Sequence, residues 1–174
     1  MSPNAMDILE ALYTRRSIRK YTMGDVSPEI VQKILKAGMS APTSGNQRQW
    51  QFVVVRDREQ MEKLIEAYPY ATMLRDVPVA VIVCHDKSRE KWEARWQMDC
   101  ANATLNMLLA IHGLGLGGLW LEIYPIEERV RMVQEFFGMP EGIVPLAVVP
   151  IGHPAEEKPS EDRYDESIVH YDTW

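Results

Sequence analysis

Cysteine is scarce in this chain, and its histidines lack the spacing of metal ligands. The two cysteines, Cys84 and Cys100, form no CxxC pair and cannot supply a disulfide framework. We expect both to be buried thiols in a reducing cytoplasm. The four histidines are not spaced as ligands with one another or with the cysteines. The sequence therefore predicts no metal site.

Positive charge and long apolar stretches are also limited. The chain has 19 lysines and arginines against 25 aspartates and glutamates, a net charge of −6. This balance argues against nucleic acid as a partner, because contacts to a phosphate backbone need a basic surface. The longest apolar stretch, 105–121, approaches the length of a membrane span, but Asn106, His112 and four glycines interrupt it. We expect no transmembrane segment, and no signal peptide because no basic segment with an apolar core opens the chain.

The length of 174 residues fits one domain with its own hydrophobic core. No linker, internal repeat or low-complexity tract divides the chain. We predict a single domain over 1–174, in which 1–5 form a disordered lead-in. Residues 152–174 are polar, contain proline and are expected to form an extended tail.

Hydrophobic periodicity and cap residues predict five helices and four strands in the order α-α-β-α-β-α-β-α-β. The helices are expected at 7–13, 28–38, 59–67, 89–111 and 126–137, and the strands at 50–55, 79–84, 119–123 and 144–151. The run 79–84 is apolar throughout, as in a strand covered on both faces. This order indicates an α+β fold around a central sheet.

The expected helix 89–111 is apolar on nearly every side. Such a helix is buried either in a core or against a partner chain. Trp92 and Trp96 fall at helical spacing within it. Together with ten methionines they indicate core or interface packing, although a flavin or substrate cavity would use the same residues.

Three arginines and a serine gather in five residues of this acidic chain: Arg15, Arg16, Ser17 and Arg19. Guanidinium groups match phosphate oxygens in charge and geometry, so the cluster suits a phosphate. The cluster also follows an apolar helix, and arginines at a helix C-terminus are favoured by the helix dipole alone. Both interpretations are open from this segment by itself.

A second polar segment, Ala41-Pro42-Thr43-Ser44-Gly45-Asn46, follows about two dozen residues later. Its backbone and short side chains can offer hydrogen bonds to a flat polar ring. A phosphate site combined with a site for a polar heterocycle describes a mononucleotide cofactor.

The run 113–118 matches the GxGxxG dinucleotide fingerprint, but in the wrong context. That motif works after a strand and at the start of a helix, where the helix N-terminus meets the pyrophosphate. Here it ends a helix and leads into a strand, so we interpret it as a helix cap and a close-packing turn.

Asp99 is either a buried anchor or a partly exposed acid, and Arg163 forms either a surface ion pair or a second phosphate contact. Glu156 and Glu157 are interpreted as solvent-facing.

Six segments in order resemble the FMN-dependent nitroreductase-like flavoproteins, over nearly the whole chain. They are Arg-Arg-Ser-x-Arg at 15–19, Ala-Pro-Thr-Ser-Gly-Asn-Gln-x-x-Trp at 41–50, Asp-Cys-Ala-x-Ala-x-x-Asn at 99–106, Gly-Leu-Gly-Leu-Gly-Gly-Leu-Trp at 113–120, Pro-Ile-Gly-His-Pro-Ala at 150–155 and Arg-Tyr-Asp-Glu-Ser at 163–167. Each segment alone is weakly specific, whereas the ordered set is strongly specific.

The resemblance implies a layered α+β fold, with a mainly antiparallel or mixed central sheet flanked by helices and a C-terminal tail extending onto the partner subunit. It implies that Arg15, Ser17 and Arg19 hold the phosphate and ribityl oxygens of FMN. Arg163 would reach the same phosphate, and Arg16 would contribute main-chain contacts.

Two further segments are implied at the flavin ring. The loop that reaches the flavin of the other subunit corresponds to Pro42, Thr43, Ser44 and Asn46. The backbone that faces flavin N5 corresponds to Leu121, Glu122 and Ile123. The family often has Gln-Pro-Trp where this chain has Arg48-Gln49-Trp50, and often a glycine after Leu121. The chain is also short for the family, so we expect no inserted helical lid.

The resemblance implies an oxidoreductase that acts as an obligate homodimer with FMN at the interface. NAD(P)H would reduce the flavin at N5 and leave, and a nitroaromatic, quinone or similar oxidant would then enter the same space. Because FMN carries the chemistry, no catalytic acid or base is nominated. The alternatives are another reaction on the same fold, such as reductive dehalogenation or flavin fragmentation, and a flavin carrier or sensor without turnover.

Overall fold

A computed structural model describes residues 6–174, so the expected lead-in at 1–5 lies outside the described residues. The α-helices are α1 (Ile8–Thr14), α2 (Pro28–Met39), α3 (Arg58–Ala67), α4 (Trp96–Gly113) and α5 (Glu127–Phe136). The strands are β1 (Tyr21–Thr22), β2 (Trp50–Val55), β3 (Val79–Asp86), β4 (Gly117–Gly118), β5 (Leu121–Glu122) and β6 (Ile143–Pro154). Short 3-10 turns are η1 (Ser44–Asn46), η2 (Thr72–Arg75), η3 (Lys87–Arg89) and η4 (Glu166–Ile168).

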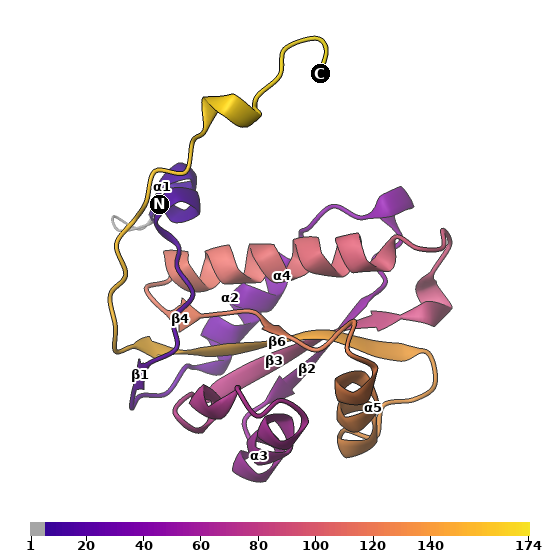
Figure 1. Cartoon of the computed structure of the whole chain (residues 1–174). Helices are drawn as coiled ribbons and strands as arrows, with labels where there is room; N and C mark the ends of the chain where they lie inside the picture. Colours follow the sequence, from indigo (N-terminus) through magenta and orange to yellow (C-terminus); the bar gives the residue numbers. More distant parts are fainter. Residues whose placement is uncertain (1–5) are drawn as a thin grey trace.

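The central sheet is antiparallel in each described pairing, and helices cover both of its faces (Figure 1). Its strand order is β1-β6-β3-β2, and β4 and β5 also pair with β6. On β3, Val79, Val81 and Val83 pack with α2 and α4, whereas Ala80 and Ile82 face α3 and α5. All eight residues of β3 are buried, which confirms the strand covered on both faces and the α+β class.

Local cap residues account for three helix starts. The side chains of Asp7, Ser27 and Asp57 each accept a hydrogen bond from a backbone N–H in the first turn of α1, α2 and α3. Pro28 occupies the first helical position of α2, as expected. The three predicted starts at residues 7, 28 and 59 therefore agree with the structure to within one residue, because each depends on a cap residue next to it in the sequence.

The expected start of the long helix at residue 89 is wrong, because α4 begins at Trp96. The backbone N–H groups of Lys91 and Trp92 donate to the side-chain oxygen of Gln47, at 2.8 and 3.3 Å, rather than to a helical carbonyl. Ala94 also has a left-handed φ of 57°. The preceding loop therefore belongs to the packing around Gln47, and the side chain of Trp92 is exposed.

Within the expected strand at 119–123 only the two-residue strand β5 forms, and β1 and β4 were not predicted. All three lie along β6, which continues to Pro154, so the first three residues of the expected tail belong to the sheet. Gly152 pairs with Gly117 and His153 with Thr22. Such short strands give no periodic signal of their own, because β6 supplies their hydrogen-bonding partner.

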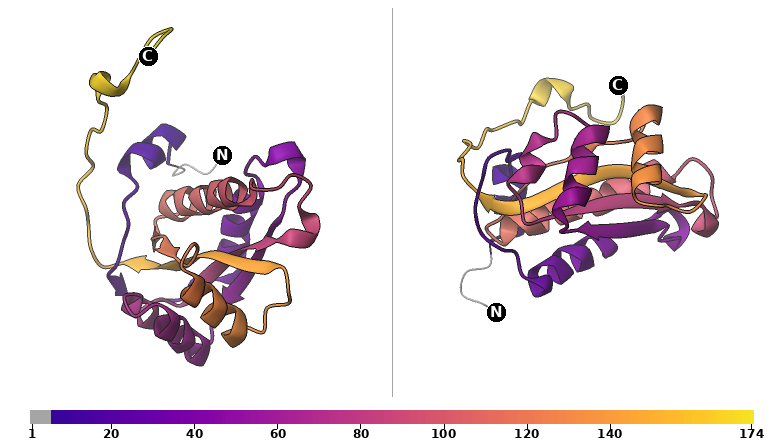
Figure 2. Two further views of the ribbon diagram at one scale, coloured as in Figure 1. Left: turned by 45° about the vertical axis from the view of Figure 1, so that its right-hand side comes forward. Right: turned by 90° about the horizontal axis from the view of Figure 1, so that it is seen from below.

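Residues 155–174 leave the sheet and run past α1, away from the layered body (Figures 1 and 2). The tail contains only the turn η4, and its large apolar side chains at Tyr164, Ile168, Tyr171 and Trp174 are exposed. None of the helices described over 6–174 is long and apolar enough to cross a membrane.

Candidate functional site

A cavity of about 700 Å³ lies between the end of α1 and the C-terminal tail. Arg15 and Arg16 line it from the segment that leaves α1, and Arg163 lines it from the tail. The structure thus brings together cations that are almost 150 residues apart in sequence. Arg163 forms the surface ion pair that the sequence left open, with the Glu161 carboxylate at 3.4 Å. It also lines the cavity, so the phosphate contact stays a prediction.

Like charges lie close together at this cavity. Burial lowers the pKa of the Arg15 guanidinium, and the nearby charges of Arg16 and Arg163 lower it further. A lowered pKa on a base means that its charged form is disfavoured where it stands. An anion between these groups would relieve that cost, and guanidinium groups bind phosphate oxygens especially well.

Arg16 occupies the space between this cavity and a second one of about 420 Å³, which it also lines. Its Nε donates to the carbonyl of Pro159 at 3.0 Å, so its side chain connects the segment after α1 to the tail. Its Nη2 is buried without a partner among the described residues. The second cavity is closed on one side by a hydrogen bond of 2.8 Å between Thr14 Oγ1 and His112 Nε2.

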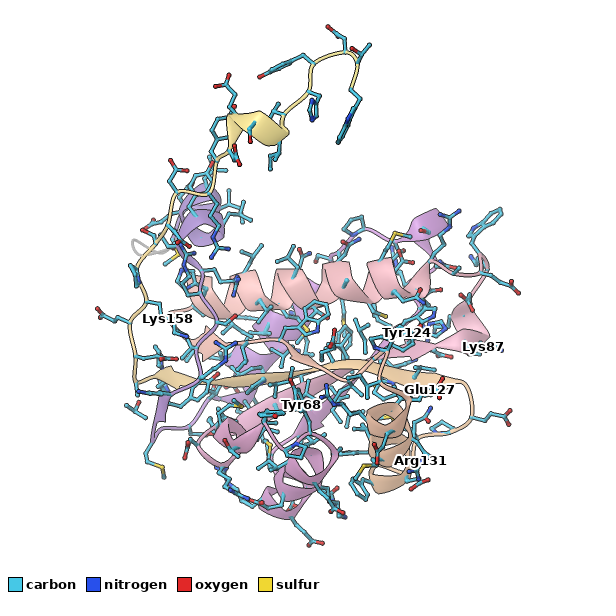
Figure 3. All side chains as sticks on the ribbon, in the orientation of Figure 1. Tyr68, Lys87, Tyr124, Glu127, Arg131 and Lys158 are labelled. Atoms are coloured by element: carbon cyan, nitrogen blue, oxygen red, sulfur yellow. The ribbon has the colours of Figure 1, made fainter. Side chains whose placement is uncertain are left out.

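Glu156 and Lys158, neither of which the sequence analysis assigned to the site, fasten the base of the tail to the arginine segment. Glu156 accepts hydrogen bonds from the backbone N–H groups of Arg19 and Lys20, at 2.6 and 3.3 Å. Lys158 donates to the carbonyl of Ser17 at 2.6 Å and lies 3.4 Å from Glu156 (Figure 3). These contacts lower the pKa of the Glu156 carboxyl. The expectation that Glu156 simply faces solvent is therefore wrong.

Ser17 and Arg19 take part in this arrangement through their backbones. The Ser17 carbonyl and the Arg19 N–H both bond to the base of the tail. Neither side chain lines either of the two cavities, and Arg19 is exposed. A role for these side chains in holding the phosphate and ribityl oxygens stays a prediction.

The glycine run 113–118 packs against the same arginine segment. The Ile18 N–H donates to the Gly118 carbonyl at 3.1 Å, and a Cβ on Gly117 would lie 2.9 Å from the Ile18 side chain. Gly115 has a φ of 74° directly after the helix end. The run therefore caps α4 and allows a close approach, as the reversed order of helix and strand predicted.

The loop predicted to contact a flavin ring is anchored at the other end of α4. Asp99 is 2% exposed and accepts hydrogen bonds from the Ser44 N–H at 3.0 Å and from the side-chain amides of Gln47 and Gln49, both at 3.1 Å. Asp99 is therefore the buried anchor, which resolves the alternative left open by the sequence. Pro42 and Asn46 are exposed beside these contacts.

A left-handed turn gives this loop its shape. Gly45, Asn46 and Arg48 have φ angles of 56°, 52° and 48°. Asparagine tolerates this conformation and glycine favours it. A Cβ on Gly45 would lie 2.6 Å from the indole nitrogen of Trp92, so the loop and the exposed Trp92 ring are in close contact.

The structure does not bring this loop to the arginine cavity within one chain. Asp99 holds the loop near the start of α4, whereas His112 contacts Thr14 near its end. At ~1.5 Å of rise per residue, these positions are about 20 Å apart along the helix. The two segments predicted to contact one cofactor are thus separated by most of α4 in a single protomer.

The third predicted segment forms an outer edge of the sheet. The Ile123 N–H donates to the Leu146 carbonyl at 3.0 Å, and Glu122 lies opposite Ala147. Antiparallel residues alternate between pairs that exchange hydrogen bonds and pairs that do not, so the backbone N–H of Glu122 points away from β6. Of the predicted residues Leu121, Glu122 and Ile123, Glu122 offers the outward backbone donor.

The protein is an α+β protein, with an antiparallel sheet covered on both faces. A cationic cavity at one end of α4 and an outward backbone edge suit a small anionic ligand. The sequence profile of the Nitroreductase family matches residues 12–68 and 65–153. The chain belongs to this family. The resemblance to nitroreductase-like flavoproteins that the six segments indicated is confirmed, and so is the nitroreductase-like α+β fold.

Individual relatives and solved structures agree with this assignment. The chain is 47% identical over 169 residues, 97% of its length and 88% of the relative's, to a protein of Methanothermobacter thermautotrophicus provisionally named NADH dehydrogenase/NAD(P)H nitroreductase. A crystal structure from Parabacteroides distasonis with the same provisional name superposes with a TM-score of 0.91 at 35% identity, covering 96% of this chain and 98% of that one. A nitroreductase from Desulfovibrio desulfuricans, described in complex with FMN, superposes with a TM-score of 0.83 at 30% identity, covering 96% and 97%.

Proposed function

We propose that this chain is an FMN-dependent oxidoreductase that takes electrons from NAD(P)H and delivers them to a small-molecule oxidant such as a nitroaromatic or a quinone. The observation that carries the proposal is the cavity lined by Arg15, Arg16 and Arg163 in a chain of the Nitroreductase family. The FMN complex of the D. desulfuricans relative and the NAD(P)H in the name of the M. thermautotrophicus relative support the choice of cofactor and donor.

The residues present fit FMN better than a dinucleotide. The cations converge on one cavity, which suits the single phosphate of FMN. The glycine run that resembles a dinucleotide fingerprint ends α4, so it presents no helix N-terminus to a pyrophosphate. Arg15 and Arg163 would hold the phosphate, with Ser17 and Arg19 at the ribityl oxygens.

The protein would contribute position and electrostatics to the reaction. When bound, FMN supplies the hydride-transfer chemistry at N5. The outward N–H of Glu122 is suited to donate to the ring, and such a donor stabilises negative charge that develops there. No side-chain acid or base is proposed for the hydride transfer. NAD(P)H and the oxidant would bind one after the other in the same space beside the flavin, as in a ping-pong reaction.

A homodimer with FMN at the interface would complete the site. Large apolar side chains are exposed on α1 and α4, namely Ile8, Leu9, Leu12, Tyr13, Met98 and Leu105. A groove of about 380 Å³ runs between α1, α2 and α4. Surfaces of this kind mark protein interfaces. In a dimer, the loop 42–46 of one subunit would reach the flavin held by the other, and the tail would extend onto the partner subunit.

Sedimentation tests the dimer. We expect the purified chain to sediment as a dimer at micromolar concentration, because the exposed apolar faces of α1 and α4 would be covered only in that state. Leu105→Glu should shift the population toward monomer and release flavin, whereas Glu66→Gln on the exposed side of α3 should not. A stable yellow monomer of the unaltered chain would refute the proposed interface.

The oxidoreductase function predicts a yellow protein whose flavin bleaches on anaerobic addition of NADH or NADPH. Subsequent addition of a quinone should restore the absorbance, with one equivalent of quinone reduced to the hydroquinone per flavin reoxidised. If neither nicotinamide bleaches the flavin, a carrier or sensor role replaces the enzyme. Bleaching followed by reoxidation only with a halogenated substrate would indicate reductive dehalogenation instead. The two buried free thiols, Cys84 and Cys100, support a cytoplasmic location for this activity.

A further inference from the structure

Arg129, near the start of α5, links the outer edge of the sheet to α3. Its Nη1 donates to the Glu122 carbonyl at 3.0 Å. Its guanidinium carbon lies 3.8 Å from the centre of the Tyr68 ring, a cation–π contact at the end of α3. The guanidinium group therefore contacts both β5 and the end of α3.

The carbonyl that Arg129 contacts lies on the same side of the strand as the free backbone donor. Glu122 does not exchange hydrogen bonds with Ala147 across the sheet, so both its N–H and its C=O point away from β6. Arg129 occupies the carbonyl and leaves the N–H available. The strand β5 is only two residues long and is attached to β6 through its neighbour Ile123, so the Arg129 contact adds an attachment on the outer side of this edge.

The charge of Arg129 is not neutralised by a neighbouring carboxylate. Within residues 6–174 it forms no ion pair, although Arg131 on the same helix pairs with Glu135 at 3.2 Å. Its two contacts are to a carbonyl and to an aromatic face, which both leave the positive charge in place. A positive charge near a redox group favours the reduced, more negative form of that group.

We propose that Arg129 is a positioning residue for the flavin reaction. It fixes β5 so that the Glu122 N–H faces the flavin ring, and it places an uncompensated positive charge beside that edge. This proposal rests on the proposed function, because it assumes that the 121–123 edge faces the ring. It assigns to α5 a part in the reaction that the six family segments do not include.

The test compares Arg129→Met, Arg129→Lys and the matched control Arg131→Met, which removes an exposed arginine two residues along the same helix. In stopped flow, Arg129→Met should reduce its flavin with NAD(P)H at least about 10-fold more slowly, as expected for loss of a charged hydrogen bond. Its flavin midpoint potential, titrated with dithionite, should become more negative. Arg129→Lys should restore the potential but only part of the rate, because a lysine retains the charge without the planar fork. FMN affinity should change less than about 3-fold, because the phosphate cavity lies elsewhere.

A measurement on the FMN-free protein tests the positioning role without turnover. The Ile123 N–H, bonded to Leu146, should exchange with deuterium at least about 10-fold faster in Arg129→Met than in Arg131→Met, since the edge is no longer held. Equal exchange, together with equal reduction rates and potentials in these two variants, overturns the proposal. Failure of the unaltered protein to bind FMN would instead refute the proposed function, and exchange at Ile123 would still report whether Arg129 holds the edge.

Discussion

Replacing Arg15 with methionine is expected to raise the Kd for FMN by about 10- to 100-fold without destabilising the FMN-free protein. A hydrogen bond to a charged group contributes ~1.5–3 kcal/mol, and every ~1.4 kcal/mol is a factor of 10 in Kd. In the absence of ligand, burial and the charges of Arg16 and Arg163 disfavour the charged form of Arg15. The same guanidinium that we propose binds the phosphate therefore lowers the stability of the FMN-free protein.

The change in Kd for FMN and the change in stability of the FMN-free protein together distinguish an arginine that binds phosphate from one that only supports folding. A base whose pKa is lowered by folding reduces stability at every pH below that pKa, so removing it relieves the cost at neutral pH. Quenching of FMN fluorescence measures the Kd, and thermal unfolding of the FMN-free protein measures stability. Arg15→Met combined with Arg163→Met should yield colourless protein. Arg131→Met, which removes an exposed arginine on α5, is the control for net charge.

A yellow double variant would contradict the phosphate site. So would a fall in melting temperature of the FMN-free Arg15→Met protein without a change in Kd, since that pattern describes an arginine used for folding alone. Potassium phosphate provides a second comparison. It should raise the melting temperature of the unaltered FMN-free protein more than that of Arg15→Met, because inorganic phosphate carries the same oxygens into the cavity.

The arginine segment could be predicted from sequence, but the partner that completes the cavity could be placed only by family resemblance. Five clustered residues are a local signal, and α1 ends at Thr14, so most of the cluster lies beyond the helix. The helix dipole therefore explains Arg15 at the cap and not the residues after it. The approach of Arg163 depends on the path of the tail, which no local pattern encodes.

The contacts that Glu156 and Lys158 make with the arginine segment could not be predicted either, because they too depend on the path of the tail. The two glutamates at 156–157 have the composition of a solvent-facing pair, and an acidic side chain near a chain end is usually exposed. Its hydrogen-bonding partner is a backbone N–H 137 residues earlier in the chain. Side chains that bind distant backbone groups leave no periodic or spacing signal in the sequence.

The wrong start of α4 has its cause in a side chain of another segment. Apolar spacing from Trp92 onward fits a helix, and intrinsic propensity does not oppose one there. Gln47 instead binds the N–H groups of Lys91 and Trp92, and Asp99 in turn holds the Gln47 amide. Tertiary hydrogen bonds thus displaced seven residues from the predicted helix. The same bonds create the loop that is predicted to reach the flavin.

Asp99→Ala is expected to be the most destabilising single change considered for this chain, at about 3–5 kcal/mol. The substitution removes the acceptor of three donors, namely the buried side-chain amides of Gln47 and Gln49 and the half-buried Ser44 N–H. Each buried unsatisfied group costs ~1–3 kcal/mol, less what local rearrangement recovers. For a chain of this length the melting temperature should fall by about 10 °C. Glu66→Ala, on the exposed side of α3, is the control and should change stability by less than about 0.5 kcal/mol.

Asp99→Asn keeps the volume of the side chain and removes one acceptor oxygen. The effect depends on whether the side-chain amides of Gln47 and Gln49 can rotate to bond with the new NH₂ group. The side-chain oxygen of Gln49 is buried without a partner, so its amide can turn and accept from the new NH₂ group. Gln47 cannot turn without releasing Lys91 and Trp92. Asp99→Asn should therefore cost roughly half as much as Asp99→Ala, and amide exchange should quicken at Lys91 and Trp92 rather than at Gln49. An Asp99→Ala protein that melts within about 2 °C of the unaltered chain would show that the loop is held by packing and not by this carboxylate.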